Sequence, residues 1–588
     1  MGAIGKFLNL LRLEDLRQRD KILSSILALL AGVGVAYAAI GFRHLIYLVQ
    51  GWMLGSSDEN ILEYVSTLAP ERILLSTITG GLIISFMYRF LMKSNRADSI
   101  AEVMAANAIN HTVIPTRRGL LSAASAAIAL GAGSAAGREG PVVHLGATIS
   151  SWISQKLHLS PNMSRTVLGC GVAAAVSASF NAPIAGVFFA LEVILGHYAL
   201  SAFAPIVIAS VSAAVVSRIH IGDFPAFIIP DYHITTFWEF PAFILLGMTS
   251  ALAAIIFIKS LFITETIAEK IPLPEWTRPA LGGLAIGLLA LISPYILGHG
   301  YGTTDGALKE LFSLKLLLLL IVLKIAASSI ALAFRFGTGI FSPSLFLGAM
   351  VGGAFGFVAS WAAGIAGDTA FSYGLYAIVG MGAVASAVLG APISTILIIF
   401  ELTGDYQITI ALMISVVISN LITQHFLKSS SVFHMQLKRG GLDLEGGRAR
   451  HVMRSTLVGS LMTDKYATAS TLATLDQIRQ TLLTQSHDHI YILDENCQIS
   501  GLITVAELQK AHSQPQGQKP EVAGDFCRPV PLTLTPSDSL EDAFHKFDIS
   551  GDETLPVVTD DPQAEIIGIL RQKYVLQAYN KALLDEKE

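Results

Sequence analysis

The stretch GSAAGREGP, residues 133–141, lies between two apolar runs at residues 120–130 and 142–153. Its glycines permit backbone angles that other residues avoid, and Pro141 suits the first turn of a helix. The stretch therefore predicts a break between two apolar helices. The second helix would point its free N–H groups and the positive end of its dipole at the break, an arrangement that favours anions.

Arg138 and Glu139 stand side by side in this break. Charged side chains are costly inside a hydrocarbon layer, so their presence there indicates a function. Glu139 is a titratable carboxylate at the place that a bound anion would take. The alternative is a loop glutamate that lies outside the bilayer.

The composition indicates a membrane protein with a soluble part. Of 588 residues, 52% are hydrophobic and 14% are charged, whereas about a quarter are charged in soluble domains. A net charge of −5, without a basic cluster, argues against nucleic-acid binding. The first apolar run, residues 22–40, is too long for a cleavable signal peptide. The cysteines show neither disulfide pairing nor metal-ligand spacing, so no metal site is predicted; they are Cys170, Cys497 and Cys527.

Broken apolar helices are expected within residues 22–437. Basic residues before the first apolar run predict a cytoplasmic N-terminal segment at residues 1–21. Long helices are expected at residues 22–50 and 73–92. Later runs fall short of the ~20 residues that span a bilayer; they include residues 119–130, 141–153, 183–195 and 392–401. Such half-helices are tolerated where they line a polar cavity, which indicates a transport pathway.

An internal repeat supports this interpretation. Residues 181–184 read Asn-Ala-Pro-Ile, and Glu192 follows nine residues after the proline. Residues 390–393 read Gly-Ala-Pro-Ile, and Glu401 follows at the same spacing. Two such halves fit the inverted repeats of transporters, with the site at the repeat interface; the alternative is chance similarity between alanine-rich helices. The two glutamates are expected to be structural carboxylates. The predicted fold class is an all-α polytopic membrane protein with inverted internal repeats and broken helices.

A second helix-opening motif, GTGIFSP at residues 337–343, has the same character. Its glycines free the backbone, its proline starts a helix, and the N–H groups of Ile340 and Phe341 are placed to bind an anion. The absence of a full positive charge in the motif favours fast release of the ion. Arg138 and Arg335 would add long-range attraction.

After residue 437 the sequence becomes polar. Residues 438–457 form a linker rich in glycine and charge. In residues 458–513 a helix is expected after Thr474, with strands at 490–493 and 501–504. The same order recurs in residues 522–583, with a helix after Ser539 and strands at 555–558 and 568–571. The tail is therefore predicted to be a pair of small α/β modules.

At these residues the chain resembles the CLC family of chloride channels and proton-coupled chloride transporters. Residues 137–141 match the family's GREGP motif, and residues 339–343 match GIFxP. Residues 180–183 and 401–406 match two further motifs, and the resemblance covers roughly residues 20–437. The tail is similar to the tandem CBS pair that many CLC proteins carry.

This resemblance implies a multi-pass protein of the cell inner or plasma membrane, with both termini in the cytoplasm. It also implies a homodimer with one pore per subunit, which needs no cofactor beyond the chloride in the pore. Glu139 would be the gating carboxylate. Chloride would bind the N–H groups of Ile340 and Phe341, and the set would include Gly339, Arg138, Gly140, Ser99 and Phe433.

Asp98 and Phe433 depart from the family's pattern. Aligned on Ile100 and Glu102, Asp98 takes the place of the serine that binds the central chloride. An ionised carboxylate about 4 Å from chloride would repel it by several kcal/mol. Three alternatives follow: Asp98 is neutral, it points away and Ser99 substitutes, or the selectivity differs. Phe433 matches the pore tyrosine but lacks its hydroxyl donor.

Val193 bears on the mechanism, because proton-coupled members often have a second glutamate at this position. Valine cannot carry a proton, so passive, voltage- or pH-gated chloride conduction is favoured. A proton-coupled antiporter is the alternative, with a nearby carboxylate or water in place of the glutamate. A membrane hydrolase with Ser134 as nucleophile lacks partner residues, and a magnesium transporter is disfavoured because helix N-termini favour anions.

CBS modules that bind nucleotides usually have Ser or Thr followed three residues later by Asp, which holds a ribose. The first module offers Thr504 with Glu507, whereas the second offers Arg571 with Tyr574, which cannot do this. Adenine-nucleotide binding at the first module and a purely structural or dimerising role are both left open.

Overall fold

A computed structural model of the chain describes residues 16–57, 64, 66–92, 96–109, 112–223, 227, 230, 232, 234, 239–365, 372–445, 447–485, 489–513, 522–530, 532–560 and 565–587. Most of the proposed N-terminal segment, residues 1–15, lies outside these ranges. The chain divides into two compact units, residues 1–442 and 443–588.

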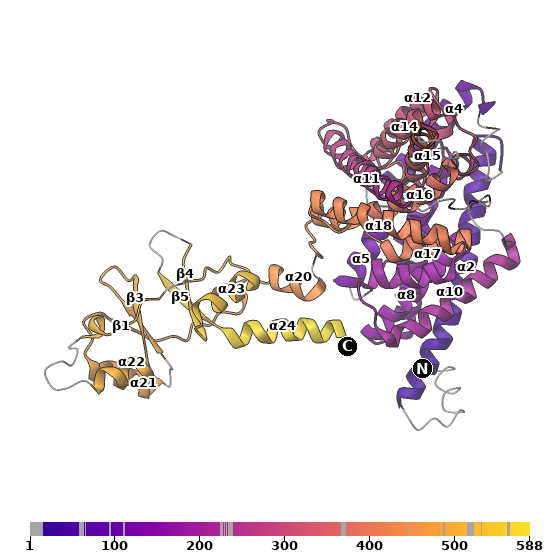
Figure 1. The fold of residues 1–588 in the computed structure, drawn as a ribbon. Helices are drawn as coiled ribbons and strands as arrows, with labels where there is room; N and C mark the ends of the chain where they lie inside the picture. The colour runs from indigo at the N-terminus through magenta and orange to yellow at the C-terminus, as the bar shows by residue number, and fades with distance from the viewer. Residues whose placement is uncertain are drawn as a thin grey trace. The chain divides into compact units, whose positions relative to one another are not determined.

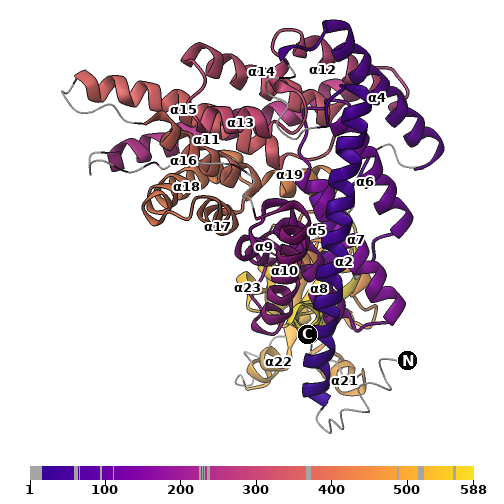
Figure 2. The same ribbon diagram turned by 90° about the vertical axis from the view of Figure 1, so that its right-hand side faces the viewer.

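The first unit is helical. Among the described residues, eight helices are long and apolar enough to cross a membrane, and the longest is α2 (Leu16–Met53). In Figure 2 this helix runs beside α8 (Pro161–Phe180) and α10 (Leu200–Ile221), against which it packs. The remaining helices of the first half are α4 (Pro70–Phe90), α5 (Ile100–Ala108), α6 (Thr116–Gly131), α7 (Glu139–Leu157), α9 (Pro183–Phe189) and the π-helical η1 (Ala190–Leu195).

The second half packs in the same manner. Figure 1 shows α11 (Glu239–Glu269), α14 (Leu314–Ala333), α15 (Phe341–Ile365) and α16 (Tyr373–Leu389) gathered together. The other elements are η2 (Glu275–Thr277), α12 (Arg278–Ala290), η3 (Pro294–Ile296), α13 (Tyr301–Leu308), α17 (Pro392–Thr403), α18 (Tyr406–Leu427) and α19 (Val432–Arg439).

The repeat predicted from the sequence is present as matched helix ends. Helix α8 ends before Asn181, whose φ is 57°, and α16 ends before Gly390, whose φ is 65°. In both places a left-handed residue stops the helix, and the following Ala-Pro pair starts the next one, because proline suits a first turn. The predicted fold class of broken helices is confirmed.

Small residues allow these helices to pack closely. A Cβ atom placed on Gly352 of α15 would lie 2.0 Å from the carbonyl oxygen of Tyr376 in α16, so only glycine fits there. Helices in a bilayer associate through such close packing, because lipid is as apolar as their side chains and the hydrophobic effect does not drive them together. Large apolar side chains such as Leu48 and Leu75 are 68% exposed and suit a lipid-facing surface.

The second unit is mixed α/β. It begins with α20 (Gly447–Ser455) and η4 (Val458–Ser460). A three-stranded sheet follows in the order β1 (Thr468–Ser470), β2 (His489–Leu493), β3 (Ile499–Thr504), with β1 parallel and β3 antiparallel to β2. Its helices are α21 (Leu475–Gln485) and α22 (Val505–His512). After η5 (Ala523–Asp525), α23 (Leu540–Ser550) leads to antiparallel β4 (Thr554–Val558) and β5 (Ile566–Arg571) and to α24 (Gln572–Lys587). The predicted helix starts and strands are confirmed.

Candidate functional site

The two glycine-rich breaks touch each other. The Gly137 N–H donates to the Gly339 carbonyl at 2.7 Å. A Cβ atom on Gly339 would lie 2.0 Å from the Gly137 oxygen, so this approach requires glycine. The bridge holds the N-terminus of α7 against the N-terminus of α15, although the two motifs lie some 200 residues apart in the sequence.

A third helix N-terminus joins them. Ser99 immediately precedes α5, and its Oγ atom would lie 2.4 Å from a Cβ atom on Gly140, whose Cβ would also lie 3.4 Å from Gly339 Cα. The N-termini of α5, α7 and α15 therefore converge at one place. Their first N–H groups have no acceptor within their own helices, so the region is electropositive without a full charge. Ile340 and Phe341, at the start of α15, are 4% and 1% exposed.

Glu139 is buried in this region, with 1% of its surface exposed. Its Oε2 atom accepts hydrogen bonds from the Ser342 hydroxyl at 2.5 Å and from the Ser342 N–H at 3.2 Å. Its Oε1 atom accepts a hydrogen bond from the Tyr301 hydroxyl at 2.7 Å. The carboxylate therefore lies at the N-terminus of α15, where an anion would be attracted.

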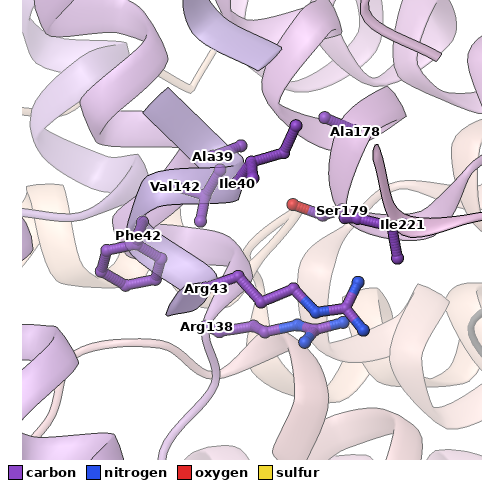
Figure 3. Close-up of a pocket in the computed structure, with 9 residues that line it drawn as sticks. All are labelled: Ala39, Ile40, Phe42, Arg43, Arg138, Val142, Ala178, Ser179 and Ile221. Atoms are coloured by element: carbon purple, nitrogen blue, oxygen red, sulfur yellow. The ribbon is translucent and has the colours of Figure 1, made fainter. Parts of the chain in front are cut away.

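Arg138 brings positive charge to the same carboxylate. Its Nε atom lies 3.8 Å from Glu139 Oε1, and its guanidinium lies 4.5 Å from the centre of the Tyr301 ring. A cavity of about 20 Å³ adjoins Arg138, which is room for a single water molecule. Figure 3 shows the Arg43 side chain of α2 extending alongside Arg138 in this cavity. Two arginines thus line one small cavity, and Arg138 is the one that reaches the carboxylate.

The Asp98 carboxylate contacts residues of α6 and α7. Its carboxylate accepts a hydrogen bond from Arg118 at 2.6 Å and lies 3.8 Å from His144 Nε2. The ion pair with Arg118 of α6 compensates the charge of this buried side chain. Ser99, its neighbour, is the residue that touches Gly140.

A second, larger cavity of about 410 Å³ reaches Ser99. Residues of α5, α19 and the segment before α15 line it, and Arg96, Arg335 and Arg439 contribute positive charge. Each arginine has an acidic partner: Arg96 pairs with Glu102, Arg335 with Glu275, and Arg439 with Glu265 and Glu269. The cavity therefore reaches Ser99, and the positive and negative side chains that line it balance.

Phe433 and Val193 are both buried. Phe433, in α19, is 1% exposed, and α19 packs against α5. Val193, in η1, is 8% exposed, and the neighbouring Ile194 carbonyl accepts a hydrogen bond from Asn107 at 2.8 Å. Ser134, considered as a nucleophile, is fully buried and donates its hydroxyl proton to the Phe336 carbonyl at 2.5 Å. Its hydroxyl is engaged in packing the break.

In the second unit, Thr504 and Glu507 bind each other. Thr504 donates its N–H to Glu507 at 3.0 Å and its hydroxyl to the same carboxylate, which caps α22. Burial would raise the pKa of Glu507, but the hydrogen bonds from Thr504 outweigh it and hold this pKa below its usual range. Arg528 lies 4.0 Å from Glu507 and pairs with Asp552. Thr504 and Glu507, for which ribose binding was left open, therefore bind each other.

Four residues of the candidate site and its surroundings are not indicated by any sequence motif. They are Tyr301, Ser342 as a hydroxyl donor, Arg118 and His144. The one local signal for Tyr301 is its place after Gly298 and Gly300, a pattern that also occurs in ordinary turns. In the described parts of the chain, no group of three or more His, Cys, Asp or Glu residues is placed to hold a metal ion.

The described residues contain eight candidate membrane spans, and shorter broken helices lie between them in the sequence. This arrangement defines an integral, multi-pass membrane protein. The chain belongs to the voltage gated chloride channel family, whose model matches residues 80–424. A CBS domain model matches residues 523–581. The family resemblance stated from the motifs is confirmed. The family comprises chloride channels and transporters rather than enzymes.

Curated relatives agree with this assignment, and solved structures share the fold. A Ralstonia nicotianae protein named for its likeness to the chloride channel ClcB is 29% identical over 414 residues, covering 70% of this chain and 95% of the relative. Chloride channel protein CLC-e of Arabidopsis thaliana is 26% identical over 574 residues, which cover 86% of this chain and 79% of the relative. The fold is similar to that of a slow cyanobacterial Cl⁻/H⁺ antiporter, with a TM-score of 0.62 and 20% identity over 71% of this chain and 97% of the other. A eukaryotic CLC transporter gives a TM-score of 0.61 and 17% identity, and the match covers 94% of this chain and 97% of the other.

Proposed function

We propose that the protein conducts chloride passively across its membrane, with Glu139 as a gate that responds to pH and voltage. The observation that carries this proposal is that the Glu139 carboxylate accepts hydrogen bonds from the hydroxyl and the N–H group of Ser342, at the N-terminus of α15. An ionised carboxylate there occupies the donors that a chloride ion needs. Protonation weakens its attraction to the helix dipole and releases those donors.

The pathway follows from the surrounding contacts. Chloride would be held by the N–H groups of Ile340 and Phe341, beside Gly339 and Gly140. Ser99 would supply the hydroxyl that the family takes from another serine, and the 410 Å³ cavity that reaches Ser99 supports this role. Phe433 would wall the pore, and Arg138 would attract anions.

Val193 supports conduction without proton coupling, because its side chain cannot carry a proton. Proton/chloride antiport is the second candidate. One observation favours it: Glu102, a carboxylate, lines the larger cavity and accepts the Ser99 N–H at 2.8 Å. A proton reaching Glu102 would stand next to the anion path.

The same proposal covers assembly and domain limits. Residues 22–437 would form the pore, 438–457 the linker, and 458–513 and 522–583 the two CBS modules. The protein would be a homodimer in the cell inner or plasma membrane, with both termini in the cytoplasm. Because Thr504 and Glu507 satisfy each other, the CBS pair would have a structural or dimerising role, and adenine-nucleotide binding is the alternative.

Flux measurements in liposomes test the proposal. Vesicles containing the wild-type protein are given an outward chloride gradient, and chloride efflux and internal pH are followed together. Chloride efflux without proton movement is expected. Sustained uphill proton movement that Glu139→Gln abolishes would overturn the channel proposal in favour of the antiporter. Protein-free vesicles measure the background leak of chloride and protons.

A further inference from the structure

Lys324 carries a basic group inside the membrane unit without an acidic partner. It lies in the middle of α14, a candidate membrane span, and its side chain is fully buried. The other buried Arg and Lys side chains of the described residues, Arg138 and Arg278, have a carboxylate at 3.8 and 3.9 Å. Among the same residues, Lys324 forms no ion pair with a carboxylate. An unpaired charge is costly in hydrocarbon, so its presence there indicates a function.

Neutral groups surround the Lys324 side-chain nitrogen. It donates to the carbonyls of Ile296 at 3.0 Å and Gly298 at 3.2 Å, and it lies 4.7 Å from the centre of the Phe346 ring. An ammonium has three protons and no acceptor, so two carbonyls and the face of a ring suit the charged form. A neutral amine would turn its lone pair toward one of these electron-rich groups. The surroundings therefore favour the ammonium, and no counterion cancels its charge.

The Lys324 ammonium lies behind the residues that contact Glu139. A Cβ atom on Gly300 would lie 3.2 Å from the Lys324 nitrogen, and the next residue, Tyr301, donates its hydroxyl proton to Glu139. Phe346 belongs to α15, whose first turn contacts the same carboxylate. Lys324 thus touches both of the segments that surround the anion region. Its charge acts there at short range, while the two carbonyls and the ring keep the ammonium itself out of contact.

We propose that Lys324 is the fixed charge that attracts anions to the converging N-termini of α5, α7 and α15, so that it determines anion affinity without binding the ion. This inference deepens the proposed function and rests on it, because it names the charge that selects anions over cations. Helix N-termini supply only partial charges, and a lysine in direct contact would hold the ion too tightly for fast release. Placed one layer back, the ammonium acts through an interior that screens charge less than water does.

The chloride affinity of neutral variants provides the test. Isothermal calorimetry of the full chain in detergent compares the wild type with Lys324→Gln, whose amide keeps two donors, and with Lys324→Met, which keeps a long unbranched side chain. Both variants are expected to weaken chloride binding about tenfold, the effect of a unit charge about 10 Å away at an effective dielectric constant of about 20. Lys324→Arg keeps the charge and is expected to retain most of the wild-type affinity.

Ser328→Ala is the matched control. Ser328 lies one turn further along α14, and its hydroxyl donates to the Ala135 carbonyl at 2.9 Å, which anchors the break before α7. Loss of this anchor should lower the thermal unfolding midpoint and leave chloride affinity unchanged.

Three results would overturn the proposal. One is wild-type affinity in either neutral variant, and another is a loss in Lys324→Arg as large as that in Lys324→Gln. The third is failure of both neutral variants to fold, since the ammonium would then serve the fold itself. Binding is measured at equilibrium, so a wild type that binds chloride and moves protons would overturn only the channel proposal.

Discussion

Glu192 and Glu401 each cap a helix that belongs to the other's repeat. The two oxygens of Glu401 accept the N–H groups of Ile184 at 3.0 Å and Ala185 at 2.8 Å, at the start of α9. Those of Glu192 accept the corresponding groups at the start of α17, at 3.0 and 2.8 Å. These reciprocal hydrogen bonds tie the two halves together, as expected for structural carboxylates.

Removing either cap should destabilise the fold more than removing its charge alone. A carboxylate that binds two free N–H groups and faces a helix dipole contributes about 1–2 kcal/mol. We expect Glu401→Ala and Glu192→Ala each to lower the thermal unfolding midpoint in detergent, and Glu401→Gln to lower it less, because an amide oxygen still accepts. Equal midpoints for the wild type and both alanine variants would contradict the capping role.

Ser99 rather than Asp98 should control chloride affinity. Because the Asp98 carboxylate is paired with Arg118, Asp98→Ser is expected to leave chloride affinity unchanged in calorimetry while lowering the unfolding midpoint. Since Arg118 is 44% exposed, water limits the loss to about 1–2 kcal/mol. Ser99→Ala is expected to weaken chloride binding with little effect on stability. The reverse pattern would return Asp98 to the pore.

Phe433 should matter through its ring. We expect Phe433→Ala to disturb chloride flux into liposomes more than Phe433→Tyr, because the ring would wall the pore and the hydroxyl is already absent. The alanine variant also loses the burial of a side chain that is 1% exposed, which costs about 3–5 kcal/mol, so its folding must be checked by gel filtration. Equal flux through the two variants would remove Phe433 from the pathway.

The CBS unit should lose an ion-pair contribution in acid. Glu541 of α23 accepts hydrogen bonds from Arg454 at 2.5 Å and from Arg450 at 2.8 Å, both in α20, and the bond from Arg454 is the main cause that lowers the pKa of Glu541. A carboxyl whose pKa is lowered by folding stabilises the folded state above its ordinary pKa of about 4.3. That stability is lost as pH falls below this value.

Hydrogen exchange of α20 and α23 in the full chain measures this effect. Between about pH 6 and pH 3, protection corrected for intrinsic rates should fall in the wild type, and Glu541→Gln should show a flatter profile from a lower starting point. Because Glu541 is 36% exposed, the effect should also shrink at high salt. Identical profiles for the two proteins would mean that this ion pair contributes nothing.

Features that depend on local sequence were predictable. The breaks at residues 133–141 and 337–343 follow from glycine and proline, whose backbone preferences act at their own positions. The matched spacing of Glu192 and Glu401 indicated the repeat. The repeated order of helix starts and strands in the tail predicted its two modules. These signals need no knowledge of the tertiary structure.

Contacts between distant residues were not predictable. Tyr301 reaches Glu139 across 162 residues, and nothing beside either residue in the sequence indicates the pairing. The direction of the Asp98 side chain was left open for the same reason, because Arg118 is brought to it by the packing of α6 rather than by a local pattern. Sequence motifs indicated where a candidate site would lie, whereas the donors around it became visible only in the fold.

Glu139→Gln should leave the pathway open and insensitive to pH. In the wild type, external acid is expected to increase chloride flux, because protonation removes the charge that holds the carboxylate on the N-terminus of α15. Glutamine has the size of the protonated form and cannot ionise, so flux through the variant should be high at neutral pH and flat from about pH 4.5 to pH 7.5. Chloride efflux from liposomes across this range measures both proteins, and Tyr373→Phe is the control, since it should keep the wild-type dependence. A variant that remains closed at neutral pH, or that still opens in acid, would show that another group is the gate.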